Sequence, residues 1–196
     1  MSIRTGLLAL LADGPRYGYQ LRSDFEARTG ATWPLNIGQV YTTLARLERD
    51  GLVSRAGADD EGRVSYAITP EGHEEVRRWF ATPVDRSTPA RDELAIKLAV
   101  AVTVPGVDVA AVVQAQRTAT LRALRDYTRL KAGAGTGDRA ELAWLLVLDS
   151  LVFAAEAEVR WLDHVEARLA RAAALPVPAT SAPDRERAAQ AGEPVR

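Results

Sequence analysis

The chain has 196 residues, 47% of them hydrophobic, and its 25 Lys and Arg nearly balance 26 Asp and Glu, giving a net charge of -1. This length suits one large or two small domains, and the near-neutral charge means that any nucleic-acid-binding surface must be a local patch. The lack of cysteine excludes disulfides, thiolate zinc sites and cysteine nucleophiles. The apolar run at the N-terminus is too short to cross a bilayer, so we expect a cytoplasmic protein with no membrane partner.

Two short amphipathic helices are predicted at the N-terminus. Residues 3–11 carry Ile and Leu on one face, and Asp13-Gly14-Pro15 then ends the first helix. A second helix is predicted from Tyr17 to Arg28 and is closed by Thr29-Gly30. These helices would support the segment that follows them.

The segment from Asn36 to Asp50 predicts a helix with two different faces. At 100° per residue, the apolar face carries Ile37, Val40, Tyr41, Leu44 and Leu47, and the polar face carries Gln39, Thr42, Thr43, Arg46 and Arg49. We expect Asn36 to be the N-cap, and Thr43 and Arg46 to point fully outward. Hydroxyl and amide groups read base edges and arginines contact guanine or phosphate, so this face suits a DNA major groove. An ordinary solvated helix face is the alternative interpretation.

A β-hairpin is predicted directly after this helix. Residues 52–55 form a short strand, residues 57–62 a loop, and residues 63–68 alternate between apolar and polar side chains. Three helices followed by such a hairpin make a winged helix-turn-helix. Arg55 and Arg63 lie at the base of the wing, where they would meet phosphate. The acidic tip at 59–61 is interpreted as a solvated loop, because its spacing lacks the alternating oxygen ligands of a calcium loop.

The rest of the chain is predicted to be helical, so the fold class is mainly α with a small β-hairpin wing. A helix opening at Thr69-Pro70 stops before Pro83, and further helices are expected over 91–102, 108–131 and 138–173. We therefore divide the chain into a DNA-binding domain (1–82), a linker (83–90), a helical dimerisation domain (91–174) and a disordered tail (175–196).

Apolar residues in the last helix recur at alternating spacings of three and four. They are Leu145, Leu148, Val152, Val159, Leu162 and Leu169. This pattern is typical of a coiled-coil seam and predicts a homodimer, although packing within one chain is the alternative. A dimer would hold two recognition helices one turn of DNA apart, about 34–36 Å, and would read a near-palindromic site.

Five aromatic residues offer a surface on which an apolar or aromatic effector could stack. They are Trp79, Tyr127, Trp144, Phe153 and Trp161. Each of them taken singly is more typical of a core or interface anchor. Nothing indicates an enzyme, a cofactor or a metal site, because His73 and His164 lie far apart without a nucleophile or metal-ligand spacing.

Four blocks of sequence together resemble the PadR family of bacterial transcriptional regulators. They are residues 7–11, 14–21, 38–53 and 66–72, which contain the patterns GYxL, VYxxLxRLExxGLV and YxxTxxG. The match covers about the first 80 residues and departs at Thr42, where members often have proline. The resemblance implies a homodimeric repressor of efflux or detoxification genes, which a small ligand releases from double-stranded DNA in some members.

The resemblance also assigns roles to individual residues. It places Tyr17 and Tyr41 beside the DNA-facing surface, Gln39, Thr42, Thr43 and Arg46 on the recognition helix, and Arg63 at a basic position of the wing. Three alternatives remain open: a MarR-like regulator, a constitutive repressor without an effector, and a winged helix that docks onto proteins. A docking surface would present apolar residues where this face is polar.

Overall fold

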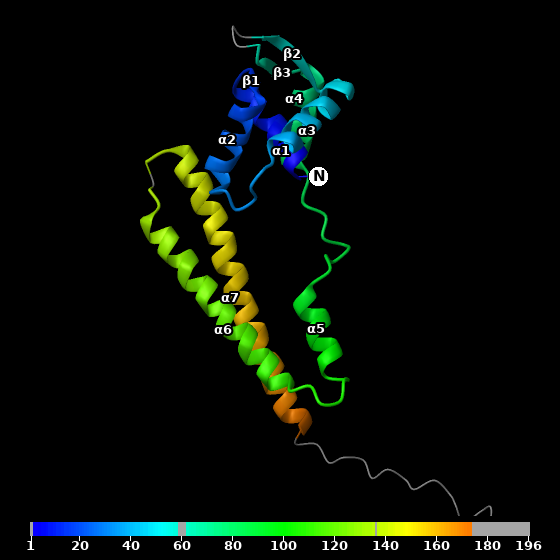
Figure 1. The fold of residues 1–196 in the computed structure, drawn as a ribbon, viewed down its shortest axis with the longest axis vertical. Helices are drawn as coiled ribbons and strands as arrows, with labels where there is room; N and C mark the ends of the chain where they lie inside the picture. Colours follow the sequence, from blue (N-terminus) through cyan, green and yellow to red (C-terminus); the bar gives the residue numbers. More distant parts are fainter. Residues whose placement is uncertain (1, 59–61, 136, 174–196) are drawn as a thin grey trace, which may run out of the picture.

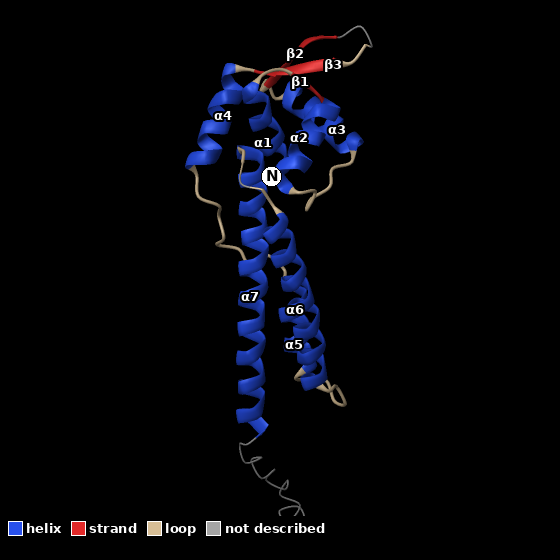
Figure 2. Cartoon of the chain, turned by 90° about the vertical axis from the view of Figure 1, so that its left-hand side faces the viewer, coloured by secondary structure: helices blue, strands red, loops and turns tan. Residues whose placement is uncertain are grey.

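The computed structural model describes residues 2–58, 62–135 and 137–173, so the wing tip and the predicted tail lie outside the described residues. The N-terminal elements are α1 (Ser2–Leu10), η1 (Leu11–Asp13), β1 (Arg16–Tyr17), α2 (Gly18–Thr29), α3 (Ile37–Arg49), β2 (Val53–Ala58), β3 (Val64–Ile68) and α4 (Pro70–Ala81). The C-terminal helices are α5 (Glu93–Ala101), α6 (Val109–Gly133) and α7 (Arg139–Ala173). The fold is mainly α with a small wing, as the sequence predicted (Figures 1 and 2).

The wing is part of a three-stranded antiparallel sheet with strand order β1-β3-β2. Tyr17 pairs with Ser65, so the short strand before α2 ties the helix-turn-helix to the wing. This strand was not predicted, because two residues are too few to show an alternating pattern. The ladder between β2 and β3 is irregular between Arg55 and Gly57, where Gly57 has a φ of 136°. Such an extra residue bends a strand and increases its twist.

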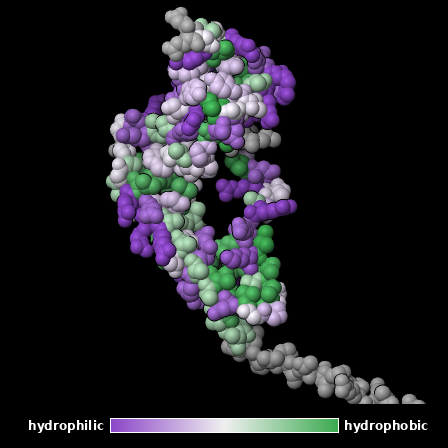
Figure 3. Space-filling view, in the orientation of Figure 1, coloured by the Kyte–Doolittle hydropathy of each residue, from purple (hydrophilic) through white to green (hydrophobic). Residues whose placement is uncertain are grey.

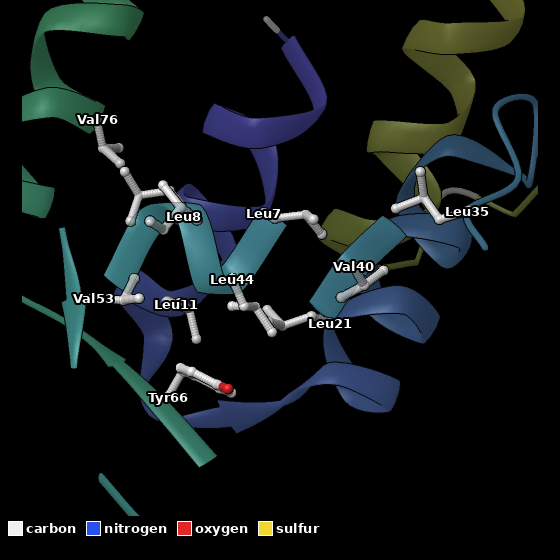
Figure 4. Close-up of a cluster of buried hydrophobic side chains, with 11 residues drawn as sticks. Leu7, Leu8, Leu11, Leu21, Leu35, Val40, Leu44, Val53, Tyr66 and Val76 are labelled. Atoms are coloured by element: carbon white, nitrogen blue, oxygen red, sulfur yellow. The ribbon is translucent and has the colours of Figure 1, made fainter. Parts of the chain in front are cut away.

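The N-terminal helices and the sheet enclose one apolar core (Figure 4). The fully buried side chains come from α1, η1, α2 and α3, and β2, β3 and α4 close the remaining sides. The cluster consists of Leu7, Leu8, Leu11, Leu21, Leu35, Val40, Leu44, Leu47, Val53, Tyr66 and Val76. Three of these belong to α3, so one face of the predicted recognition helix is fixed by the core, and its opposite face is held outward.

α6 and α7 form a long antiparallel pair, and α5 packs against their lower end (Figure 1). The buried cluster there is small and consists of Leu98, Val113 and Leu162. The other end of α7 meets the winged helix, where the Trp144 ring lies against Gly30 at the C-terminus of α2. A Cβ at Gly30 would come within 2.3 Å of that ring, so only glycine allows this close contact.

The predicted dimer seam on α7 needs correction. Leu148 and Leu162 are fully buried within a single chain, and Leu162 packs on Leu98 and Val113. Leu169 packs on the same cluster, and the remaining seam residues, Leu145, Val152 and Val159, are half-buried. The spacing of three and four correctly indicated a covered helix face, but α6 covers part of it. A periodic apolar stripe shows that a face is covered, not which chain covers it.

A different apolar stripe of α7 stays uncovered. Leu142, Leu146 and Phe153 have exposures of 54%, 62% and 66%, and at 100° per residue they fall within a narrow sector of the helix. On α5, Ile96 and Val100 are also more than half exposed, and Figure 3 shows apolar surface there. An exposed apolar stripe such as that of α7 typically marks an interaction site.

The segment between α4 and α5 contains no helix or strand over residues 82–92. Thr69 and Asp92 cap the helices on either side, accepting hydrogen bonds from Gly72 N (3.1 Å) and Ala95 N (3.0 Å). None of the described helices combines the length and apolarity needed to span a membrane.

Candidate DNA-binding surface

The turn between α2 and α3 is held by side chains that bond to the backbone. Glu26 on α2 accepts hydrogen bonds from Arg22 Nε at 2.9 Å and from Leu35 N at 3.3 Å. The bond from Arg22 is the main reason that the pKa of the Glu26 carboxyl lies below its ordinary value. The buried Leu35 then anchors the chain at the start of α3.

A reciprocal capping box fixes the N-terminus of α3. The Asn36 side chain accepts a hydrogen bond from Gly38 N at 2.8 Å, and the Gln39 side chain accepts one from Asn36 N at 3.3 Å. Both residues are exposed, as expected for DNA contacts, but their side-chain oxygens already serve the helix. Their amide NH2 groups are the parts that a DNA base or phosphate would meet.

Of the two threonines of α3, Thr42 lies as the sequence suggested and Thr43 does not. Thr42 is exposed, whereas Thr43 is half-buried on the flank facing α1 and does not point fully outward. Their hydroxyls donate to the carbonyl oxygens of Gly38 (2.8 Å) and Gln39 (2.7 Å). Each hydroxyl oxygen keeps its acceptor capacity, and each methyl group can contact a thymine methyl.

The arginines of this surface differ in how they are paired. Arg49 lies 3.4 Å from Asp50, and Arg55 on β2 lies 3.0 Å from Glu48. Arg46 is exposed, and its guanidinium makes no ion pair or hydrogen bond with the residues that the structure describes. Arg46 can therefore reach an incoming phosphate or guanine without first leaving an acidic partner.

Two tyrosines contribute to the surface, Tyr41 from α3 itself and Tyr17 from β1. Tyr41 is 38% exposed, and its ring lies so close to Gly18 that a Cβ there would be only 2.8 Å from it. Burial, aided by Tyr19, Tyr66 and Tyr17, raises the pKa of the Tyr41 hydroxyl above its ordinary value. Tyr17 in turn carries the guanidinium of Arg63, 4.9 Å from its ring centroid. Arg63 lies not at the base of the wing, as predicted, but at its tip end, just beyond the pair of Ala58 and Val64.

The sequence interpretation missed the small and neighbouring residues of the surface. Gly38 and Ala45 are exposed on the outward face of α3, where the lack of a long side chain lets a groove approach closely. Arg4 on α1 lies beside α3 and pairs with Asp50 at 2.9 Å. A hollow of about 570 Å³ between α1 and α3 is lined by Arg4, Thr43 and Arg46 among others. The helical wheel could have indicated Gly38 and Ala45, whereas the place of Arg4 depends on how α1 packs.

Comparison with known proteins shows the family to which the chain belongs. Residues 7–78 match the sequence model of the transcriptional regulator PadR-like family, and residues 90–170 match one described as virulence activator alpha C-term. The probable transcriptional regulator Rv1176c of Mycobacterium tuberculosis is 30% identical over 181 residues, covering 84% of this chain and 96% of that protein. The chain belongs to the PadR-like family of transcriptional regulators.

Solved structures support the same fold over both parts of this PadR-like chain. The virulence activator AphA of Vibrio cholerae has a TM-score of 0.66 at 23% identity, covering 87% of this chain and 99% of its own. Bacillus subtilis PadR in complex with operator DNA has a TM-score of 0.62 at 21% identity, covering 84% and 96%. The same protein in complex with p-coumaric acid has a TM-score of 0.66 at 20% identity, covering 86% and 98%.

Family membership selects among the alternatives left by the sequence. The PadR-like chain is a DNA-binding transcriptional regulator and not an enzyme. The MarR-like alternative is set aside because the N-terminal match is to PadR-like proteins, and the docking alternative because the matched family regulates transcription. Among the described residues, no group of three metal-binding side chains occurs.

The five aromatic residues proposed for an effector pocket do not come together. Trp79 contacts Phe80 on α4, Trp144 lies on Gly30, and Trp161 packs on the cluster that contains Leu162. Tyr127 lines a cleft between α6 and α7, whereas Phe153 is exposed. Trp144 and Phe153 are nine residues apart, which places them on opposite faces of a helix. The prediction of a shared pocket rested on residue type and ignored helical phase.

Proposed function

We propose that the protein is a dimeric repressor that acts in the cytoplasm, binds a near-palindromic operator and is released by a small ligand. The observation that carries the proposal is the uncovered stripe of Leu142, Leu146 and Phe153 on α7. Large apolar side chains that a long helix exposes to water favour pairing with a second copy of the chain, because pairing buries them. We keep the division into a DNA-binding domain (1–82), a linker (83–90) and a dimerisation domain (91–174) as part of this proposal.

A dimer would present two copies of α3 to DNA. For both to enter successive major grooves on one side of the duplex, they must stand about 34–36 Å apart, and the operator must repeat its half-site in inverted order. Pairing also doubles the phosphate contacts, which matters for a chain whose net charge is only -1. That PadR of B. subtilis, which has a similar fold, was solved in complex with operator DNA supports the proposal that this chain binds an operator.

Within the surface we assign three kinds of contact. Arg46 is proposed to contact a base or a phosphate, with Thr42 and Gln39 at neighbouring base edges. Phosphates are proposed to be contacted by Arg49, Arg55 and Arg63. Arg49 would first leave its ion pair with Asp50, and Arg55 its ion pair with Glu48. Asn36 and the two tyrosines, Tyr17 and Tyr41, hold the helix and the wing in position beside the backbone.

Release by a ligand is proposed from two observations. PadR of B. subtilis was solved in complex with p-coumaric acid, a small aromatic molecule, in a related fold. In this chain the Trp144 ring on α7 lies directly against the end of α2, so a shift of α7 would act on the helix-turn-helix. The contact of Trp144 with Gly30 is thus the proposed route from the C-terminal helices to DNA.

The test is footprinting of the DNA upstream of the protein's own coding region at two salt concentrations. Wild type should protect a near-palindromic site, and Arg46→Ala should weaken binding by about 1–3 kcal/mol if Arg46 contacts a base. If Arg46 instead contacts a phosphate, the variant should lower the slope of binding against salt concentration by about 1. Arg129→Ala, an exposed arginine on α6, is the matched control and should protect DNA as wild type does. Equal protection by Arg46→Ala would remove Arg46 from the surface.

Activation of transcription is a second candidate function. The C-terminal match is to virulence activator alpha C-term, and AphA itself is a virulence activator. A transcription assay on the footprinted promoter separates the two functions, because a repressor lowers and an activator raises the transcript when the protein is added. The dimer and the surface on α3 serve either role.

A further inference from the structure

A cleft of about 340 Å³ lies between α6 and α7, apart from the surfaces described so far. It is lined on α7 by Leu151 and Glu158, among others. At 100° per residue these two residues fall on the side of α7 opposite Leu146 and Phe153. Pairing through the exposed stripe would therefore leave this cleft open.

Small side chains create the cleft between α6 and α7. Its walls include Ala119 and Ala123 from α6, and Ala154 and Ala155 from α7. Farther along α7 in both directions, Leu148 and Leu162 are fully buried between elements of the chain. The cleft is open to solvent, since Ala119 and Ala154 are exposed, and its volume lies in the range of about 300–1,000 Å³ that is typical of small-molecule sites.

A carboxylate stands at one end of the cleft. Glu158 Oε1 accepts a hydrogen bond from Gln116 Nε2 at 2.8 Å and contacts the hydroxyl of the buried Thr120. These partners are neutral, and no cationic side chain among the described residues pairs with Glu158. The neighbouring Arg117 is already bound to Asp163 at 2.7 Å and to Glu166 at 2.8 Å.

An aromatic ring stands at the other end. Tyr127 lines the cleft from α6, seven residues after Thr120, which corresponds to about 10 Å along the helix. Between the two ends the lining is alanine and leucine. The cleft thus offers a carboxylate, an apolar channel and a ring in sequence, and the ring face itself attracts cations.

We propose that this cleft binds a small organic cation with an apolar body. The ammonium or amidinium group would donate to Glu158, and the body would lie between the alanines toward Tyr127. A cation supplies the opposite charge that Gln116 and Thr120 do not provide, and charge-assisted hydrogen bonds are the stronger kind. An anionic ligand would meet the carboxylate of Glu158 directly. This inference names a ligand class and a site for the release step in the proposed function, and it rests on that function only for the effect on DNA.

The binding test uses the full-length chain without DNA, in isothermal titration calorimetry. Three phenylalkyl probes of about the same length carry an ammonium, a hydroxyl or a carboxylate: 4-phenylbutylamine, 4-phenylbutan-1-ol and 4-phenylbutyrate. The amine should bind, and the alcohol and the carboxylate should bind at least about tenfold more weakly. Equal binding of all three probes, or no binding of the amine to wild type, overturns the proposal.

Two variants locate the site. Glu158→Gln keeps the shape of the side chain and should weaken amine binding by about tenfold to a hundredfold. Glu156→Gln, on the same helix outside the cleft lining, should bind the amine as wild type does. Ala123→Leu fills the cleft and should abolish binding while the helical circular dichroism stays unchanged. Unaltered binding by Glu158→Gln, or conversion of a dimer to a monomer by Ala123→Leu, overturns the proposal, the latter by making the cleft a subunit contact.

Footprinting with and without the amine separates this inference from the proposed function. Protection of DNA together with amine binding that needs Glu158 supports both. Protection without such binding overturns the cation site alone. Amine binding that depends on Glu158, without protection of any DNA, leaves the site in place and removes the repressor function.

Discussion

The winged helix and the C-terminal helices differ in how far they bury their apolar side chains. The winged helix encloses an apolar core contributed by seven elements, whereas the C-terminal cluster contains only Leu98, Val113 and Leu162. Large apolar side chains of α5 and α7 remain exposed instead, with Phe153 at 66%. Elements from several directions can close a core within one chain, but two long helices side by side can cover only one side of each other. The first region therefore has a full core of its own, although Phe80 on α4 is 72% exposed, whereas the second region has little core and a long apolar stripe left for a partner.

The largest expected effect tests the difference in burial between the core of the winged helix and the exposed stripe of α7. Leu44→Ala removes a fully buried side chain of α3 and should lower the free energy of unfolding by about 2–5 kcal/mol. Leu146→Ala removes the same atoms from an exposed position and should change the stability of the isolated subunit far less. Urea unfolding followed by circular dichroism measures both. Similar losses from both variants would contradict the contrast between the two regions.

The next effect tests whether the exposed stripe of α7 pairs two subunits. The double variant Leu146→Asp, Phe153→Asp places two charges on this stripe and should weaken dimerisation by about a hundredfold or more. Sedimentation equilibrium across micromolar concentrations measures it. Thr118→Asp on an exposed part of α6 adds a charge elsewhere and should leave the dimer intact. A wild type that is monomeric at these concentrations would remove the proposed dimer.

A smaller effect tests how the recognition helix is held. Asn36→Ala removes the acceptor for Gly38 N and should destabilise the winged helix by about 1 kcal/mol. Asn36→Asp keeps an acceptor oxygen and should retain most of the stability. Thermal unfolding of the three proteins compares them, and an alanine variant as stable as wild type would show that the capping box contributes nothing here.

The smallest effect concerns pH. Because burial raises the pKa of the Tyr41 hydroxyl, the folded state keeps its proton at a pH where unfolded tyrosine, with a pKa near 10, has begun to lose it. The resulting stability is present below pH 10 and is lost as the pH rises through the folded pKa. Tyr41→Phe should therefore lose stability less steeply above pH 10 in denaturant titrations. Parallel pH curves for the two proteins would rule out this contribution.

The sequence predicted correctly those features that depend only on residues within a short stretch. The helix over 37–49, its cap at Asn36 and its core face of Val40, Leu44 and Leu47 all follow from local periodicity and capping chemistry, and the structure has them. The hairpin and the break before Glu93 follow from alternation and from prolines in the same way. The first strand was predicted too short, because β2 continues past its irregularity to Ala58, where the sequence indicated a loop from residue 57. The resemblance to PadR proteins rested on the same stretches, which is why it was correct.

The predictions that were wrong concern residues whose surroundings come from other elements of the fold. The half-burial of Thr43 depends on α1, the intrachain burial of Leu148 and Leu162 on how α6 and α5 lie, and the scattering of the aromatic residues on helical phase. Local sequence determines that a helix forms and which face is apolar, because both follow from backbone geometry within a few residues. Which element covers that face depends on contacts between residues far apart in the chain. Only the tertiary structure decided that α6 covers part of the predicted seam, leaves Phe153 in water and opens a cleft beside Glu158.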